Sequence, residues 1–275
     1  FSSRLPLIRR APRGIDANFH LLAAARFSKG HPPKVLNKFV VGDSYTYPSL
    51  LHFLLSLIPE RARPKALFML SAIPDYAIAL LTYVLALQFV PELYALAAAA
   101  LYSFTPITYV ESISETPRSL GALWYSLSIV LLPQRGILET GLAAVAIAFT
   151  LLSHKMATQT LLFTCLIISP FLYSANNFFP LTFLYGFMLV LLLTRGRYMA
   201  TLKDHALGIN FYLRHGSWDK RRKRPDSLQR LIKFQPFFYV PIAGLLLYPQ
   251  AFLNETSLIL AWSMAVFIIY CVWLW

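Results

Sequence analysis

A carboxylate and an imidazole lie one helical turn apart in the segment Gly14-Ile-Asp16-Ala-Asn-Phe-His20. If Asp16 opens a helix, its side chain and that of His20 share one face, because residues four apart are neighbours on a helix surface. A carboxylate placed there could take a proton from a hydroxyl, or bind a divalent cation through its oxygens. The structural alternative is that Asp16 is a helix N-cap, a position that aspartate commonly occupies.

A second polar segment, Glu111-Ser-Ile-Ser-Glu115-Thr-Pro-Arg118, joins two apolar runs of the chain. Two carboxylates and an arginine in so short a connector indicate a loop that faces a ligand, because binding residues concentrate on loops held by rigid elements. The alternative is a solvated connector in which Glu115 caps the helix that follows.

Two further polar positions interrupt apolar runs. Ser153-His154-Lys155 ends one of them, and charged residues at such a depth normally face a bundle interior or a polar cavity. A lysine beside a histidine suits a phosphate group, whereas snorkelling of Lys155 to lipid headgroups is the alternative. Asp75 lies deep in another run, where it is either functional or paired with backbone groups that Pro74 frees.

The elements that must position these groups are strongly apolar. Of 275 residues, 57% are hydrophobic and 13% are charged, whereas a soluble domain has about 25% charged residues. This composition excludes a disordered or collagen-like chain and predicts an integral membrane protein with several spans. Nucleotide-binding glycine loops, a serine-hydrolase elbow and paired-cysteine motifs are absent from the sequence, and Cys165 and Cys271 are expected to be packing residues.

The expected fold class is all-α, a polytopic transmembrane helical bundle with interfacial helices in the first loop. Apolar runs that predict spans lie at 66–88, 91–110, 119–133, 137–153, 157–174, 178–194, 236–253 and 257–275. Shorter helices at the membrane interface are expected at 16–28, at 48–57 and around 202–213. The chain therefore divides into a first extramembrane loop (1–64), a core transmembrane bundle (65–194), a basic loop (195–235) and C-terminal transmembrane helices (236–275).

The net charge of +13 is distributed unevenly along this arrangement. If all eight runs cross, one side holds 24 of the 25 Lys and Arg and all six His, and the other side holds Arg135. The positive-inside rule would place the basic side in the cytosol. An anionic lipid surface or a phosphate-bearing lipid explains the basicity better than nucleic acid does. Because the chain starts at Phe1 rather than Met, we expect further residues to precede it.

The order of the polar motifs resembles that of a known superfamily. Asp16-x-x-x-His20 is followed by Lys-Gly-His-Pro-Pro, then Tyr45-Thr-Tyr-Pro-Ser-Leu-Leu-His52, then Ser-Glu115-Thr-Pro-Arg118 and Leu-Leu-Ser-His-Lys. Over about residues 1–175 this is similar to the multi-span GT-C glycosyltransferases, which include protein mannosyltransferases and lipid-A aminoarabinose transferases. It particularly resembles the uncharacterised prokaryotic members that carry a Tyr-Pro-Pro-Leu-x-His segment after the first loop.

The resemblance implies an enzyme that moves a sugar from a polyprenyl-phosphate donor to the hydroxyl of an acceptor glycan, lipid or protein, usually with inversion. Asp16 would be the general base, and Glu111 and Glu115 would form the second acidic loop, which handles the acceptor or a metal. The lipid phosphate would be held by Arg118, His154 and Lys155. Supporting polar residues of the first loop would be His20, Asp43, Tyr47 and His52.

The sequence departs from the family at two points. Ile15 and Ala17 stand where a second acid often neighbours the base, so no metal is assigned and a divalent cation remains an alternative. The family places its first loop outside the cytosol, in conflict with the charge count. One non-crossing run between 119 and 194 would move the 195–235 loop to the cytosol. Following the resemblance, we expect a prokaryotic plasma-membrane protein with an exoplasmic active face.

Two other functions remain as alternatives. A transporter of an anionic lipid-linked substrate would need charged residues at mid-membrane in several spans, whereas Asp75 alone is clearly placed there. A non-catalytic membrane subunit would instead scaffold a partner protein, and it would tolerate the loss of Asp16.

Overall fold

The computed structural model describes residues 14–30, 45–87, 89–104, 115–175 and 178–215, and these residues form helices and connecting segments without strands. The helices are α1 (Gly14–Phe27), α2 (Leu50–Ser56), α3 (Arg63–Ala86), α4 (Glu92–Phe104), α6 (Arg118–Leu131), α7 (Ile137–Ser153), α8 (Lys155–Ala175), α9 (Phe179–Thr194) and α10 (Tyr198–His215). The all-α prediction is therefore confirmed for this part of the chain. The runs predicted at 236–253 and 257–275 lie outside the described residues.

Local sequence explains where several of these helices begin and end. A short 3-10 turn at Glu60–Ala62 leads into α3, which has Pro64 in its first turn, where a missing backbone N–H is tolerated. Gly30 follows α1 with φ of 88°, a conformation that glycine adopts without steric cost. A helix is present where one was predicted around 202–213, and it is α10; its place at a membrane interface stays a prediction.

Two N-cap interpretations are wrong. Asp16 lies in the first turn of α1, which begins two residues earlier at Gly14. Its charge still complements the positive end of the helix dipole, so the position remains favourable for a carboxylate. Similarly, Pro117 occupies the N-cap position of α6 without a side-chain hydrogen bond, and Glu115 lies two residues before it.

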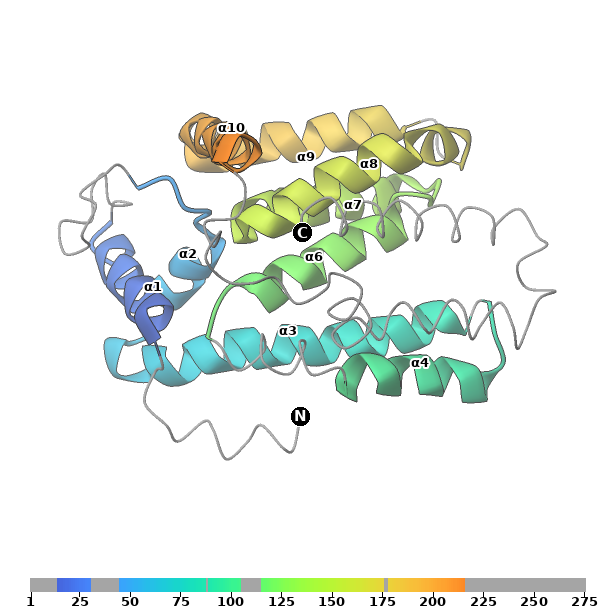
Figure 1. The fold of residues 1–275 in the computed structure, drawn as a ribbon, viewed down its shortest axis with the longest axis horizontal. Coiled ribbons are helices and arrows are strands. Elements are labelled where there is room, and N and C mark those ends of the chain that lie inside the picture. The colour runs from blue at the N-terminus through green and yellow to red at the C-terminus, as the bar shows by residue number, and fades with distance from the viewer. Residues whose placement is uncertain (1–13, 31–44, 88, 105–114, 176–177, 216–275) are drawn as a thin grey trace.

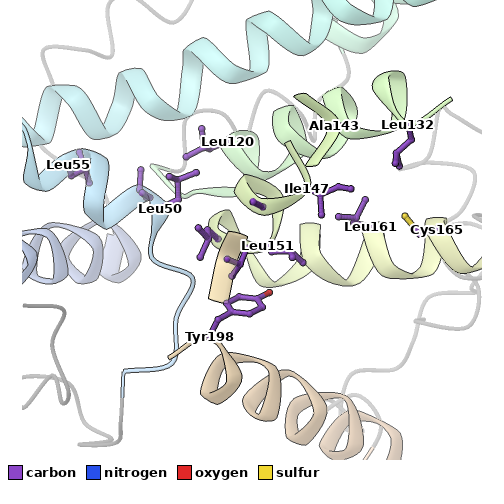
Figure 2. Close-up of a cluster of buried hydrophobic side chains, with 14 of the residues drawn as sticks. Leu50, Leu55, Leu120, Leu132, Ala143, Ile147, Leu151, Leu161, Cys165 and Tyr198 are labelled. Carbon is purple, nitrogen blue, oxygen red and sulfur yellow. The ribbon is translucent and has the colours of Figure 1, made fainter. Parts of the chain in front are cut away.

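The helices α3, α4, α6, α7, α8 and α9 run back and forth along roughly one direction, whereas α10 lies across it (Figure 1). The helix α6 packs on α3 and on α7, α7 packs on α9, and α4 lies beside α3. Buried leucine, isoleucine and alanine side chains of α6, α7 and α8 form the core, which extends to Leu50 and Leu55 of α2 and to Tyr198 of α10 (Figure 2). The core therefore ties α2 and α10 to the bundle.

Glycine permits the closest helix contacts. A Cβ at Gly186 of α9 would lie 2.7 Å from Cγ2 of Ile147 and 2.8 Å from the carbonyl oxygen of Ala144, both on α7. A Cβ at Gly121 of α6 would lie 2.9 Å from the Cβ of Ala157 at the start of α8. The bundle packs more tightly at these two points than any larger residue would allow.

One helix among the described residues is long and apolar enough to cross a membrane. It is the 27-residue stretch Glu60–Ala86, with a mean hydropathy of 1.6. The pair Phe179–Thr194 and Tyr198–Leu207 passes the same test only together, and it is bent by 114°. The apolar helices Glu92–Phe104 and Ile137–Ser153 are shorter.

The described polar segments meet at one end of the bundle, on the left in Figure 1. There α1 and α2 lie beside the start of α3, the start of α6 and the α7–α8 junction, and α10 crosses the end of α9. We call this the polar end. It gathers the sequence motifs that the pattern of apolar runs predicts to share one side.

Candidate functional site

A pair of buried histidines joins α1 to α2 at the polar end. Nδ1 of His20 lies 2.8 Å from Nε2 of His52, and the Tyr45 hydroxyl forms a hydrogen bond with Nδ1 of His52. Burial lowers the pKa of His20 to about 4, although the nearby Asp16 opposes this shift. Burial, and then His20, lower the pKa of His52 well below its ordinary value. Both rings are therefore neutral at pH 7.

Aromatic rings surround the histidine pair. The ring centroids of Phe19, Tyr45, Tyr47 and Phe27 lie 5.6, 5.7, 5.7 and 6.0 Å from that of His52. The short α2 that carries His52 is held by Nε of the buried Arg63, which donates hydrogen bonds to two backbone carbonyls of this turn. The helix is thus fixed by tertiary contacts, since seven residues are too few to be stable alone.

Tyr47 lies near Asp16, the predicted base, and near residues predicted to bind the lipid phosphate. Its ring centroid lies 6.5 Å from that of His154. Burial, and then the negative charge of Asp16, raise the pKa of Tyr47, and the positive charge of Arg118 partly opposes them. The phenol therefore remains protonated at physiological pH. Asp16 of α1 and Arg118 of α6 are far apart in the sequence, and both side chains are exposed.

His154 and Lys155 connect α7 to α8. Burial lowers the pKa of His154 to about 4, and the basic side chains of Arg118, His20, His205 and Lys155 lower it further. His154 is therefore neutral at pH 7 and can donate or accept a hydrogen bond, but it does not supply the positive charge that its neighbour Lys155 provides. Lys155 forms an ion pair with Oδ2 of Asp204 on α10, and both side chains are about one-third exposed, at 34% and 37%.

The acidic loop is only partly described. Glu115 is 5% exposed and has φ of 57°, a left-handed conformation that is uncommon for residues other than glycine. Its carboxylate is thus buried, in contrast to the exposed Asp16. Glu111 and Asp43 lie outside the described residues.

The carboxylate predicted to lie inside a membrane span has a partner that the sequence does not reveal. The Tyr102 hydroxyl of α4 donates a 2.8 Å hydrogen bond to Oδ1 of the buried Asp75. Pro74 does lie inside α3, as the alternative interpretation requires, but this contact is with a tyrosine side chain rather than with freed backbone. Asp75 therefore also links α3 to α4.

The donor groups of the described residues do not form a metal site. Within the described ranges, no group of three or more His, Cys, Asp and Glu side chains is arranged to hold a metal ion. The His20–His52 contact uses both facing nitrogen atoms for one hydrogen bond, so neither is directed at a common ligand.

Three residues of the polar end were missed by sequence reasoning: Tyr45, Asp204 and His205. Tyr45 stands in the same motif as Tyr47, and this proximity was the available signal. Asp204 and His205 belong to α10, whose periodicity predicts a helix but not its contact with the α7–α8 junction. Nε2 of His205 is buried and has no hydrogen-bond partner among the described residues.

Comparison of the chain with protein-family models, with curated proteins and with solved structures finds no match.

Proposed function

We propose that the protein is a multi-pass membrane glycosyltransferase that moves a sugar from a polyprenyl-phosphate donor to an acceptor hydroxyl, with Asp16 as general base. One observation carries the proposal: Asp16 and Arg118 both lie within electrostatic reach of the Tyr47 hydroxyl. A carboxylate and a guanidinium that both act on this phenol are suited to the roles of base for the acceptor and cation for the departing phosphate.

Exposed apolar side chains support a bundle with several spans. On α9, Leu181, Leu184, Tyr185, Met188 and Leu192 are exposed at 43–71%. On α3, the exposed side chains include Ile73, Tyr76, Leu80 and Val84. Contiguous apolar surface of this extent is rare on soluble monomers and suits contact with lipid. We infer that α9 and the shorter apolar helices cross the membrane alongside α3, whose length alone is sufficient.

The proposed reaction assigns each polar group a step. The Asp16 carboxylate takes the proton of the acceptor hydroxyl as its oxygen forms a bond to the anomeric carbon. The bond from that carbon to the phosphate oxygen breaks, and the polyprenyl phosphate leaves with the electron pair, stabilised by the Arg118 guanidinium. Attack from the face opposite the leaving group inverts the anomeric configuration. Tyr47, held protonated, can donate a hydrogen bond to substrate between the two.

The resemblance supplies the remaining features of the proposal. The donor is a sugar on a polyprenyl phosphate, the acceptor is a glycan, lipid or protein, and the polar end faces the exoplasmic side of a prokaryotic plasma membrane. The basic residues at this end suit the anionic lipid phosphate.

The test uses the full chain reconstituted in vesicles. Each assay contains one donor, polyprenyl-phosphate-linked mannose, glucose or aminoarabinose, and a total membrane extract that supplies acceptors. Release of polyprenyl phosphate is followed by mass spectrometry. We expect turnover of at least one donor, and a loss of about 100-fold or more for Asp16→Asn, the range of general-base removal.

Glu139→Gln is the matched control, because it neutralises an acid in the first turn of α7, at the opposite end of the bundle. It should retain full turnover. Unchanged turnover in Asp16→Asn would overturn the base assignment, and the absence of polyprenyl phosphate release from all three donors would overturn the activity itself.

A further inference from the structure

Two helix N-termini converge beside His154. The helix α8 begins at Lys155, and the first turn of α6, which begins at Arg118, packs against the same junction. A Cβ at Gly121 would lie 3.0 Å from the Cβ of His154, so little separates the two elements. Each N-terminus carries a partial positive charge and free backbone N–H groups, which together favour a bound anion.

The side chains at this junction are strongly biased in charge. Each side chain that lowers the pKa of His154 electrostatically is basic, and two of them, Arg118 and Lys155, carry a positive charge at pH 7. The other two, His20 and His205, are neutral at that pH because burial lowers the pKa of each to about 4. Against them stands the Asp204 carboxylate, which reaches Lys155 from α10. A carboxylate thus occupies a position that the surrounding charges would offer to any anion.

At the same place, one buried polar atom has no hydrogen-bond partner within the described part of the chain. His205, adjacent to Asp204, is 5% exposed, and its Nε2 has no hydrogen-bond partner among the residues that the structure describes. Its charged neighbours are Lys155 and Asp204. Buried side-chain nitrogens are normally hydrogen-bonded, so this ring is suited to a ligand atom or to a rearrangement of α10.

We propose that the Lys155–Asp204 ion pair marks the binding site of the lipid phosphate monoester. In the absence of phosphate the Asp204 carboxylate occupies this site, and the phosphate displaces it. The phosphate would bind between Lys155, Arg118 and the N-termini of α6 and α8, and His205 would gain a partner as α10 shifts. This inference rests on the proposed function, because it identifies where the leaving group of that reaction is held.

The different charges of donor and product give the Asp204 carboxylate a role in the reaction cycle. The sugar-bearing donor is a phosphodiester with one negative charge, whereas the polyprenyl phosphate product is a monoester with about −1.5 to −2 charge. The product therefore displaces Asp204 more effectively than the donor does. Return of Asp204 to Lys155 then competes with the bound product and promotes its release.

The test measures binding of farnesyl phosphate to the purified full chain in detergent by isothermal titration calorimetry, and it requires no sugar transfer. Asp204→Asn removes the competing carboxylate. A partly exposed ion pair contributes up to about 1 kcal/mol, and phosphate repulsion adds to it, so we expect binding about five- to tenfold tighter than in the wild type. Lys155→Gln should weaken binding by a similar factor.

Glu139→Gln is again the matched control, since it changes the net charge as Asp204→Asn does but at the far end of the bundle. It should leave the affinity unchanged. Equal or weaker binding by Asp204→Asn, or equal tightening by Glu139→Gln, overturns the proposal.

A second measurement uses the wild-type chain and does not depend on the folding of a variant. With saturating farnesyl phosphate, backbone amides of 198–207 should exchange hydrogen at least about threefold faster, because α10 loses its tie to Lys155. Unchanged exchange at saturation overturns displacement. If the chain binds farnesyl phosphate in this manner but releases no lipid phosphate from any donor, the proposed activity fails while the binding site stands.

Discussion

The imidazoles of His20 and His52 form a 2.8 Å nitrogen–nitrogen hydrogen bond that joins α1 to α2. Because both rings are neutral, each has one donor and one acceptor nitrogen, and the Tyr45 hydroxyl extends the same chain. Protonation of the nitrogen that accepts this hydrogen bond would turn it into a donor and set two N–H groups against each other. The packing of α1, which carries Asp16, therefore depends on neutral histidines.

The first prediction concerns pH. His20 has an ordinary pKa of 6.5 and a pKa of about 4 in the folded chain, so below pH 6.5 the unfolded chain binds more protons. The free energy of unfolding therefore falls as pH decreases from 6.5 towards 4, by up to about 1.4 kcal/mol per pH unit for each such histidine. His52 and His154 shift in the same direction.

Thermal unfolding of the full chain in detergent at pH 7.5 and pH 5 checks this dependence. The double variant His20→Gln, His52→Gln replaces the pair with amides that do not titrate, and its unfolding temperature should vary less between the two pH values. Equal unfolding temperatures of the wild type at both pH values would contradict the prediction.

The second prediction concerns the contact between α6 and α8. Gly121→Ala places a methyl group 2.9 Å from the Cβ of Ala157 and 3.0 Å from that of His154. This overpacking should reduce the free energy of unfolding by about 1–3 kcal/mol. Gly141→Ala in α7 is the control, because its Cβ would meet nothing within 4 Å and alanine favours a helix by about 0.5–1 kcal/mol. Urea unfolding should show opposite signs for the two variants.

The third prediction concerns the link between α3 and α4. Tyr102→Phe removes a hydrogen bond to the buried Asp75 carboxyl group and should cost about 1–3 kcal/mol of unfolding free energy. Tyr94→Phe, on the exposed side of the same helix, should change the stability by less than about 0.5 kcal/mol. Similar losses in both variants would show that the Asp75 contact is not what stabilises this pair of helices.

The fourth prediction concerns the support of α2. Nε of Arg63 donates to the carbonyls of Leu55 and Ile58 at 3.1 and 3.0 Å. Arg63→Lys loses this fixed geometry and should cost about 1.5–3 kcal/mol, whereas Arg61→Lys at an exposed position should be neutral. Circular dichroism melting measures both. A neutral Arg63→Lys would mean that the core contacts of α2 hold it without the guanidinium.

The sequence predicts the helices better than their contacts. Apolar run length places α3, α7 and α9 well, because burial or lipid contact demands continuous apolar segments. It misplaces Asp16 as an N-cap, since helix ends are set by tertiary packing as well as by capping propensity. That the described helices cross a membrane stays a prediction, and α3 is the one among them that is long and apolar enough by itself.

In the candidate site too, the sequence predicts which residues gather better than it predicts their contacts and charge states. The motifs predict that Asp16 and Arg118 gather at one end, and their common effect on Tyr47 agrees with this. The neutral state of His154 and the pairing of Lys155 with Asp204 depend on burial and on the path of α10, neither of which local spacing encodes. Their catalytic and phosphate-binding roles remain predictions.

Because the chain bends between α9 and α10, the direction of α10 depends on the number of residues in α9. Arg195 and Gly196 have φ of 51° and 77°, and the chain turns there by 114°. At 3.6 residues per turn, each added residue rotates the end of a helix by about 100° about the helix axis. One residue inserted into α9 would therefore swing α10 around the bundle axis and carry Asp204 away from Lys155, so the length of α9 sets where α10 points.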